Sequence, residues 1–230
     1  MSVRDHHGQR SAGVSARGSD QTNRVRHAFL QALEAYAGLL GRREVEAAWE
    51  PPSLLEGYSV AGLAGHAFNT AEAVERYLQA PVPTRVTVPA AAYYGQPPSN
   101  PATAATQVGI IERGRMRGAE GPTVLRRDAV ALVQRLTAQL GSAPPDRVVA
   151  VMGGTALRLD DYLETRLVEL VVHGDDLAAS VEIPSELPAE AVELVINHLL
   201  AVARFRHGDL AVVRAFARRE RDTSNALRVF

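Results

Sequence analysis

The fold depends on the stretch Tyr162-Leu-Glu-Thr-Arg-Leu-Val-Glu-Leu-Val-Val-His173, which is mostly apolar but carries a carboxylate and an imidazole four residues apart. In an α-helix this spacing places Glu169 and His173 on one face. A helix this apolar is normally buried, and an unpartnered carboxylate or imidazole in a core costs on the order of several kcal/mol. The stretch therefore predicts a metal ion, an ion pair or a hydrogen-bond network between the two side chains.

Two more polar residues share this face. At roughly 100° per residue, Tyr162, Arg166 and His173 all fall within about 60° of Glu169 around the helix axis. The sequence thus predicts a buried helix that presents Tyr, Arg, Glu and His together.

The ends of this helix also have sequence signals. Asp161 and Glu164 have the spacing of a capping box, which predicts the helix start. Gly174, directly after the histidine, is expected to interrupt the helix.

The composition excludes several classes of protein. With 230 residues and 46% hydrophobic content, the chain can form one main domain with a sizeable core. A net charge of -1 gives no electrostatic signal for nucleic acid or an anionic membrane, and no run approaches the roughly 18 apolar residues of a spanning helix. Because Cys is absent, thiol chemistry would need a thiol from another molecule. We expect a soluble protein that binds neither nucleic acid nor membrane.

Residues 1–21 are rich in Arg, Gly, Ser and His and lack the apolar core of a secretory signal. This composition predicts a disordered tail on a cytoplasmic protein.

The rest of the chain has mainly helical periodicity. Ser59 can cap the helix predicted over about residues 60–80, and His66 lies at the edge of the apolar stripe of this helix. A Pro/Gly/Asn-rich loop over residues 89–100 is expected to lie over the site. The first four predicted helices span about residues 22–40, 60–80, 101–115 and 123–140.

The last third of the chain begins with two short β-like runs, over residues 148–152 and 155–159, which predict a hairpin leading into the central helix. Two further helices follow, one opening at Pro188 and one capped by Asp209. Residues 227–230 are expected to form a terminal strand that pairs with the hairpin.

The polar face of the central helix is typical of a metal site. A carboxylate oxygen of Glu169 and an imidazole nitrogen of His173 can converge on one ion, and His66 is the natural third ligand. The alternative is that the Glu/His pair has no ligand role, because such pairs are frequent at i, i+4 spacing, and that His66 is a surface or hydrogen-bonded residue.

The residues around these positions resemble a known family. The stretch from Trp49 to His66, followed about a hundred residues later by residues 165–177, is similar to the mycothiol-dependent maleylpyruvate isomerase family of the DinB-like superfamily. In that superfamily a small-x-L-x-x-H helix start and an E-x-x-x-H helix hold a divalent metal, usually zinc. The resemblance implies that His66, Glu169 and His173 are metal ligands.

The resemblance covers about residues 25–180 and implies a mainly α fold. We expect a DinB-like four-helix bundle with a short β-hairpin and a small C-terminal helical/strand extension. The expected domains are the tail over 1–21, the metal-binding bundle over 22–180 and an extension over 181–230 that packs on the bundle. The isomerase proper has a larger C-terminal domain, so the resemblance leaves the substrate unknown.

The resemblance implies a metal-dependent isomerase or thiol S-transferase, with zinc as metal, mycothiol as co-substrate and a small electrophile as substrate. The alternative is a non-enzymatic metal-binding or partner-binding bundle of a stress-response type. An oligomer is compatible with such a bundle, although no predicted face is apolar enough to commit to a dimer.

Two residues of the polar face are candidates for binding the cofactor or substrate. Arg166 can bind an anionic group, or it can be a structural partner of Glu169 or Glu164. Tyr162 can donate a hydrogen bond at the site, or it can belong to the core. Beyond the helix face, Asp175 and Asp176 can orient a ligand histidine or be solvated charges.

Overall fold

The computed structural model describes residues 8–84, 87–95, 101–151 and 154–217, and within them the side chains from residue 21 onward except those of 101–105. The helices among these residues are α1 (Gly8–Leu39), α2 (Arg43–Ala47), α3 (Val60–Gln79), α4 (Ala90–Tyr94), α5 (Pro101–Gly118), α6 (Pro122–Ser142), α7 (Leu159–Ser180), α8 (Ala189–His207) and α9 (Asp209–Ala217). The strands β1 (Val148–Ala150) and β2 (Ala156–Arg158) pair antiparallel. The mainly α fold with a short hairpin is therefore confirmed.

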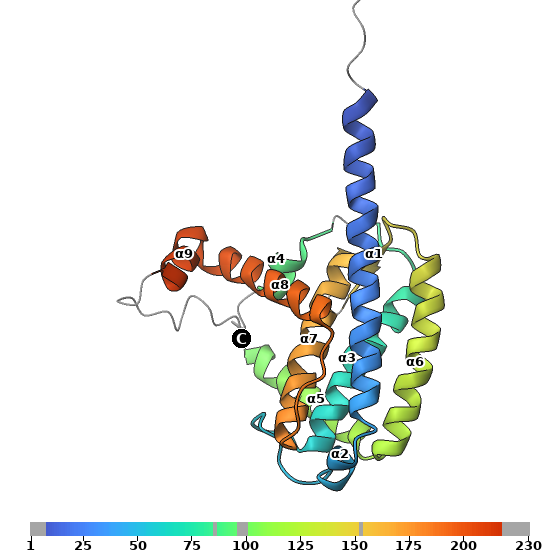
Figure 1. Cartoon of the computed structure of the whole chain (residues 1–230), viewed down its shortest axis with the longest axis vertical. Helices are drawn as coiled ribbons and strands as arrows, with labels where there is room; N and C mark the ends of the chain where they lie inside the picture. The colour runs from blue at the N-terminus through green and yellow to red at the C-terminus, as the bar shows by residue number, and fades with distance from the viewer. Residues whose placement is uncertain (1–7, 85–86, 96–100, 152–153, 218–230) are drawn as a thin grey trace, which may run out of the picture.

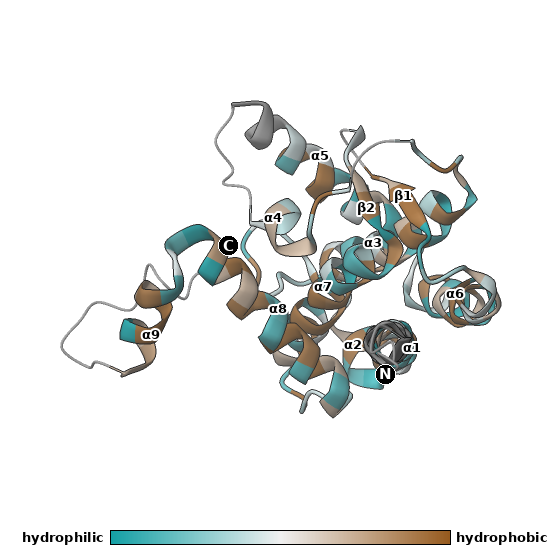
Figure 2. Ribbon diagram, turned by 90° about the horizontal axis from the view of Figure 1, so that it is seen from above, coloured by the Kyte–Doolittle hydropathy of each residue, from teal (hydrophilic) through white to brown (hydrophobic). Residues whose placement is uncertain are grey.

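Four long helices, α1, α3, α6 and α7, form the bundle. Both α1 and α3 pack against α6 and α7, and the four helices lie side by side in Figure 1. The helix predicted over residues 22–40 lies within α1 and has an apolar side in the core, since Phe29, Leu33 and Tyr36 are all buried. Figure 2 shows the same bundle from above, with α5 beside α3 and α8 beside α7.

The first helix begins earlier than its periodicity predicts. The prediction places its start near Thr22, whereas α1 begins at Gly8. No proline precedes Thr22, so nothing in the backbone stops the helix from continuing toward the N-terminus. The helical backbone therefore extends through most of the segment for which the composition predicts a disordered tail.

The second predicted helix is confirmed as α3, and the Ser59 hydroxyl caps it by accepting a hydrogen bond from the Gly62 amide at 3.1 Å.

α3 crosses α5 at unusually short range. A Cβ added to Gly118 would lie 2.1 Å from the Ala61 carbonyl oxygen, and one added to Gly65 would lie 2.1 Å from the Gly114 oxygen. Only glycines allow this approach, which holds α5 beside the helix that carries His66.

The central helix is longer than the sequence predicts. The capping box at Asp161 is wrong, because α7 starts at Leu159 directly after β2 and has no side-chain cap. The interruption at Gly174 is also wrong, since α7 continues to Ser180. Gly174 is buried within the helix, and a Cβ there would lie 3.4 Å from the Leu187 side chain, which is an ordinary van der Waals contact. The described neighbours therefore do not require a glycine at this position.

The C-terminal helices start where the sequence predicts, with Pro188 at the N-cap of α8 and Asp209 at the start of α9. α8 packs on α7, and α9 contacts α8 at the outer end of an arm that leaves the bundle (Figure 1). The predicted terminal strand at residues 227–230 lies outside the described residues. Among the described helices, none is long and apolar enough to cross a membrane.

Candidate metal centre

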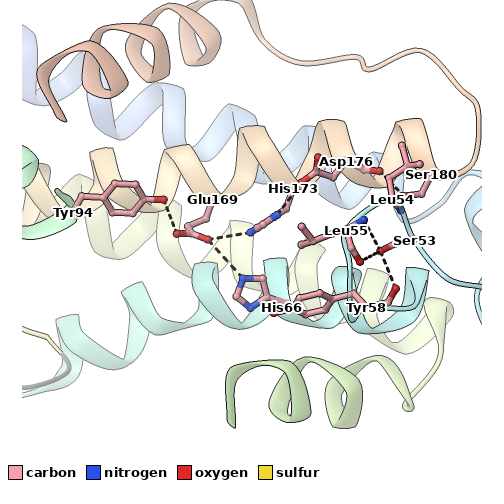
Figure 3. A network of polar contacts seen from close by, with 10 residues as sticks. All are labelled: Ser53, Leu54, Leu55, Tyr58, His66, Tyr94, Glu169, His173, Asp176 and Ser180. Atoms are coloured by element: carbon pink, nitrogen blue, oxygen red, sulfur yellow. Dashed lines mark hydrogen bonds and ion pairs between the residues drawn. The ribbon is translucent and has the colours of Figure 1, made fainter. Parts of the chain in front are cut away.

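Three side chains converge between α3 and α7. His66 comes from the second turn of α3, and Glu169 and His173 come from the middle of α7; Figure 3 shows them pointing toward one another. One possible ligand atom from each residue lies within 4.8 Å of the other two. We call this group the His–Glu–His cluster. The structure thus brings together the three residues that the sequence predicts to be ligands.

The two oxygens of Glu169 face different partners. Oε2 lies 3.2 Å from Nε2 of His173 and 3.7 Å from Nε2 of His66. Oε1 accepts a hydrogen bond from the Tyr94 hydroxyl at 2.9 Å. Burial opposes ionisation of this carboxyl, but both histidines and the nearby Arg166 guanidinium hold its pKa well below the usual value. Glu169 is therefore a carboxylate with one oxygen directed at the cluster centre.

His173 is held from its far side. Its Nδ1 lies 3.2 Å from the Asp176 carboxylate, one turn later on α7. Burial disfavours the charged imidazole, yet Asp176 and Glu169 together raise the pKa of His173 to about 9. The contact engages Nδ1 and leaves Nε2 toward Glu169, which is the arrangement that orients histidine ligands in metal sites.

Cavities adjoin the cluster at both ends. The first, of about 530 Å³, runs along α7 toward its N-terminus, and we call it the arginine cavity. The second, of about 720 Å³, runs toward the C-terminal end of α7, and we call it the Asp176 cavity. Both are lined by His66 and Glu169, so the cluster lies between them. The side chains of the cluster are only 14 to 16% exposed.

The arginine cavity contains the two residues that the sequence proposes for cofactor binding. Arg166 and Tyr162 both line it, and the Arg166 guanidinium lies over the Tyr162 ring at 5.1 Å. Arg166 approaches Glu169 at 3.7 Å, while Glu164 pairs with His198 instead. Arg166 is therefore both a loose partner of Glu169 and a cation at the cavity wall, and Tyr162 is a mostly buried part of that wall.

Two tyrosines of the site are not predicted from the sequence. The loop predicted for residues 89–100 contains the short helix α4, whose last residues are Tyr93 and Tyr94. Tyr93 lines the arginine cavity and Tyr94 lines the Asp176 cavity. The run Ala90-Ala-Ala-Tyr-Tyr94 does have helix propensity, and it is the signal that could have located them.

A comparison with protein families identifies the bundle. The family described as mycothiol maleylpyruvate isomerase N-terminal domain matches residues 12–178. The chain belongs to this family. No curated protein and no solved structure gives a significant match.

The mycothiol maleylpyruvate isomerase match includes the whole His–Glu–His cluster and α4. It ends at residue 178, before α8 and α9 begin, so these two helices lie outside the part that resembles the family model.

Proposed function

We propose that this protein is a metal-dependent enzyme that uses mycothiol in an isomerisation or in the transfer of a thiol to a small electrophile. The observation that carries the proposal is the convergence of two imidazoles and one carboxylate between two cavities, in a chain of the mycothiol maleylpyruvate isomerase family. We take zinc as the metal, because imidazole and carboxylate groups from three residues with an open position are typical of catalytic zinc sites.

The residues present fit such an ion. His173 has one ring nitrogen held by Asp176, and Glu169 has one oxygen held by Tyr94, so each presents its other atom to the centre. His66 completes the set from the facing helix. Because the described ligand set has three members, further coordination positions are available to a ligand that enters from a cavity.

A metal at this cluster would lower the pKa of a coordinated thiol and so supply a nucleophile near neutral pH. The chain contributes no competing thiol, because it has no Cys. Arg166 and Tyr162 would bind the polar part of mycothiol or of the electrophile by donating hydrogen bonds into the arginine cavity. The cavity walls would keep the reacting groups together and limit access of water.

Two reactions are compatible with this arrangement. Addition of the thiol to an activated double bond, followed by rotation and elimination of the same thiol, isomerises the double bond. Displacement of a leaving group transfers the thiol to the electrophile instead. In both, the partners are small molecules, and we propose a cytoplasmic location for the protein.

The test is elemental analysis of the purified protein without a His tag, combined with calorimetry of mycothiol binding. We compare the wild type with His66→Ala and His173→Ala, and use His27→Ala as control because the His27 side chain is 64% exposed on α1. The proposal requires near-stoichiometric metal and thiol binding in the wild type and control, and loss of both in the two cluster variants.

A wild type that folds without metal and ignores mycothiol after zinc is added would overturn the proposal. The cluster would then be a structural Glu/His network in a partner-binding bundle.

A further inference from the structure

His198 is a buried histidine outside the region that matches the family. It lies on α8, and the residue is only 4% exposed. Its Nδ1 lies 3.1 Å from Oε2 of Glu164 on α7. Among the described residues, Nε2 is buried and has no hydrogen-bond partner. A leucine of similar size would fill this place without the cost of an unpaired polar nitrogen, which is about 1–3 kcal/mol. Packing alone therefore does not explain the choice of histidine.

The ring of His198 packs against Tyr94, whose hydroxyl donates a hydrogen bond to Glu169. Its centroid lies 5.7 Å from that of Tyr94, with an angle of 69° between the ring planes. This edge-to-face geometry is favourable and depends on ring orientation. The Glu164 contact directs Nδ1 of the imidazole toward α7. α7 thus restrains the orientation of His198, and His198 in turn limits how Tyr94 can lie.

A second contact joins α8 to the end of α4. The guanidinium of Arg206, two turns further along α8, donates a hydrogen bond to the Gly95 carbonyl at 2.9 Å, directly after α4. α8 thus holds α4 at its last tyrosine and at the residue that follows it. α4 also contacts α7, so it lies between the extension and the central helix.

We propose that His198 is a positioning residue of the metal centre: through Tyr94 it fixes the Glu169 carboxylate so that Oε2 faces the two histidines. The Tyr94 hydroxyl donates a hydrogen bond to Oε1 of Glu169 (Figure 3), and rotation of the carboxylate would break this hydrogen bond. On this proposal, the C-terminal helix α8 completes the centre without contributing a ligand. The inference rests on the proposed function only in that the group being oriented is a metal ligand.

The experiment uses full-length protein with Tyr94→Phe, His198→Leu and the double variant. Ile196→Ala is the control, because Ile196 is on the same helix and is 53% exposed. Cobalt(II) serves as the probe, and its visible absorption spectrum and dissociation constant are measured for each. We expect each single variant to bind cobalt about 10- to 100-fold more weakly, as for other groups that orient ligands. The spectrum should change in both, and the control should match the wild type.

The double variant distinguishes positioning from general damage. If His198 acts through Tyr94, the double variant binds cobalt no more weakly than Tyr94→Phe alone, because the two changes remove one pathway. Additive losses, or an unchanged spectrum and affinity in His198→Leu together with a lower melting temperature, would overturn the proposal and leave His198 a structural residue.

A second measurement does not need the metal. Hydrogen exchange of the metal-free protein reports how firmly α4 is held. We expect the amides of residues 90–95 to exchange at least tenfold faster in His198→Leu and at the wild-type rate in Ile196→Ala. A wild type that binds no cobalt would defeat the proposed function, whereas unchanged exchange of α4 in His198→Leu would defeat the positioning role.

Discussion

Asp176 holds His173 from one helical turn away, with 3.2 Å between its Oδ2 and the Nδ1 of the ring. The other ring nitrogen lies 3.2 Å from Glu169. A carboxylate in this position fixes both the tautomer and the direction of a ligand imidazole. The next residue toward the N-terminus, Asp175, is exposed and accepts a hydrogen bond from Ser185 instead.

These two aspartates therefore form a matched pair for mutation. Asp176→Ala should weaken zinc binding by about 10- to 100-fold, because His173 loses the group that orients it. Asp175→Ala should leave zinc affinity at the wild-type value. Competition with a zinc chelator measures both constants, and equal affinity in the two variants would contradict the role given to Asp176.

Removing the charge of Arg166 should affect mycothiol binding more than metal binding. In Arg166→Gln we expect metal content to be retained and mycothiol to bind about tenfold more weakly, which corresponds to one lost charged hydrogen bond. Arg113→Gln is the control, since Arg113 lines the same cavity but is exposed. Calorimetry on zinc-loaded protein gives the comparison. Equal losses in both variants would indicate a general charge effect rather than a specific contact.

The close crossing of α3 and α5 should not tolerate a side chain. In Gly118→Ala the new Cβ would lie 2.1 Å from the Ala61 carbonyl oxygen, so the helices must move apart. Overpacking of this kind costs about 1–3 kcal/mol, and we expect a melting temperature lower by roughly 5 °C. Gly141→Ala on α6 has no atom within 4 Å of its Cβ. It should leave stability unchanged or raise it slightly.

Asp161 should make stability depend on pH in a direction opposite to most carboxylates. Burial, together with the nearby carboxylates of Glu164 and Asp160, raises the pKa of Asp161 to about 6. The folded state therefore binds this proton more tightly than the unfolded state, and ionisation destabilises the fold as pH rises from about 4 to 6. The penalty is absent below this window and complete above it.

Replacing this carboxyl with an amide tests the sign. Asp161→Asn should be more stable than the wild type at pH 7.5, by on the order of 1 kcal/mol after allowance for solvent screening. The gain should disappear near pH 4. Urea unfolding at both pH values measures it, and an equal difference at the two would exclude titration of Asp161 as the cause.

The sequence predicts those parts of the site that depend on short-range spacing. Glu169 and His173 share a face because they are four residues apart in one helix, and the phase of Tyr162 and Arg166 follows from the same repeat. The bundle helices have clear apolar stripes, so their existence is predictable even where an end is wrong, as at Gly8 and Leu159.

The parts that the sequence does not predict depend on contacts between distant segments. Tyr94 meets Glu169 across 75 positions of the chain, and His198 meets Glu164 across 34. No local pattern encodes such distances. The five-residue helix α4 is also too short for periodicity to distinguish it from a loop.

The placement of the cluster between two cavities has a kinetic consequence. If mycothiol enters from one cavity and the electrophile from the other, neither reactant blocks the path of its partner, and either can arrive first. Initial rates at varied concentrations of both would then give intersecting double-reciprocal lines, and a dead-end analogue of each reactant would compete with that reactant alone.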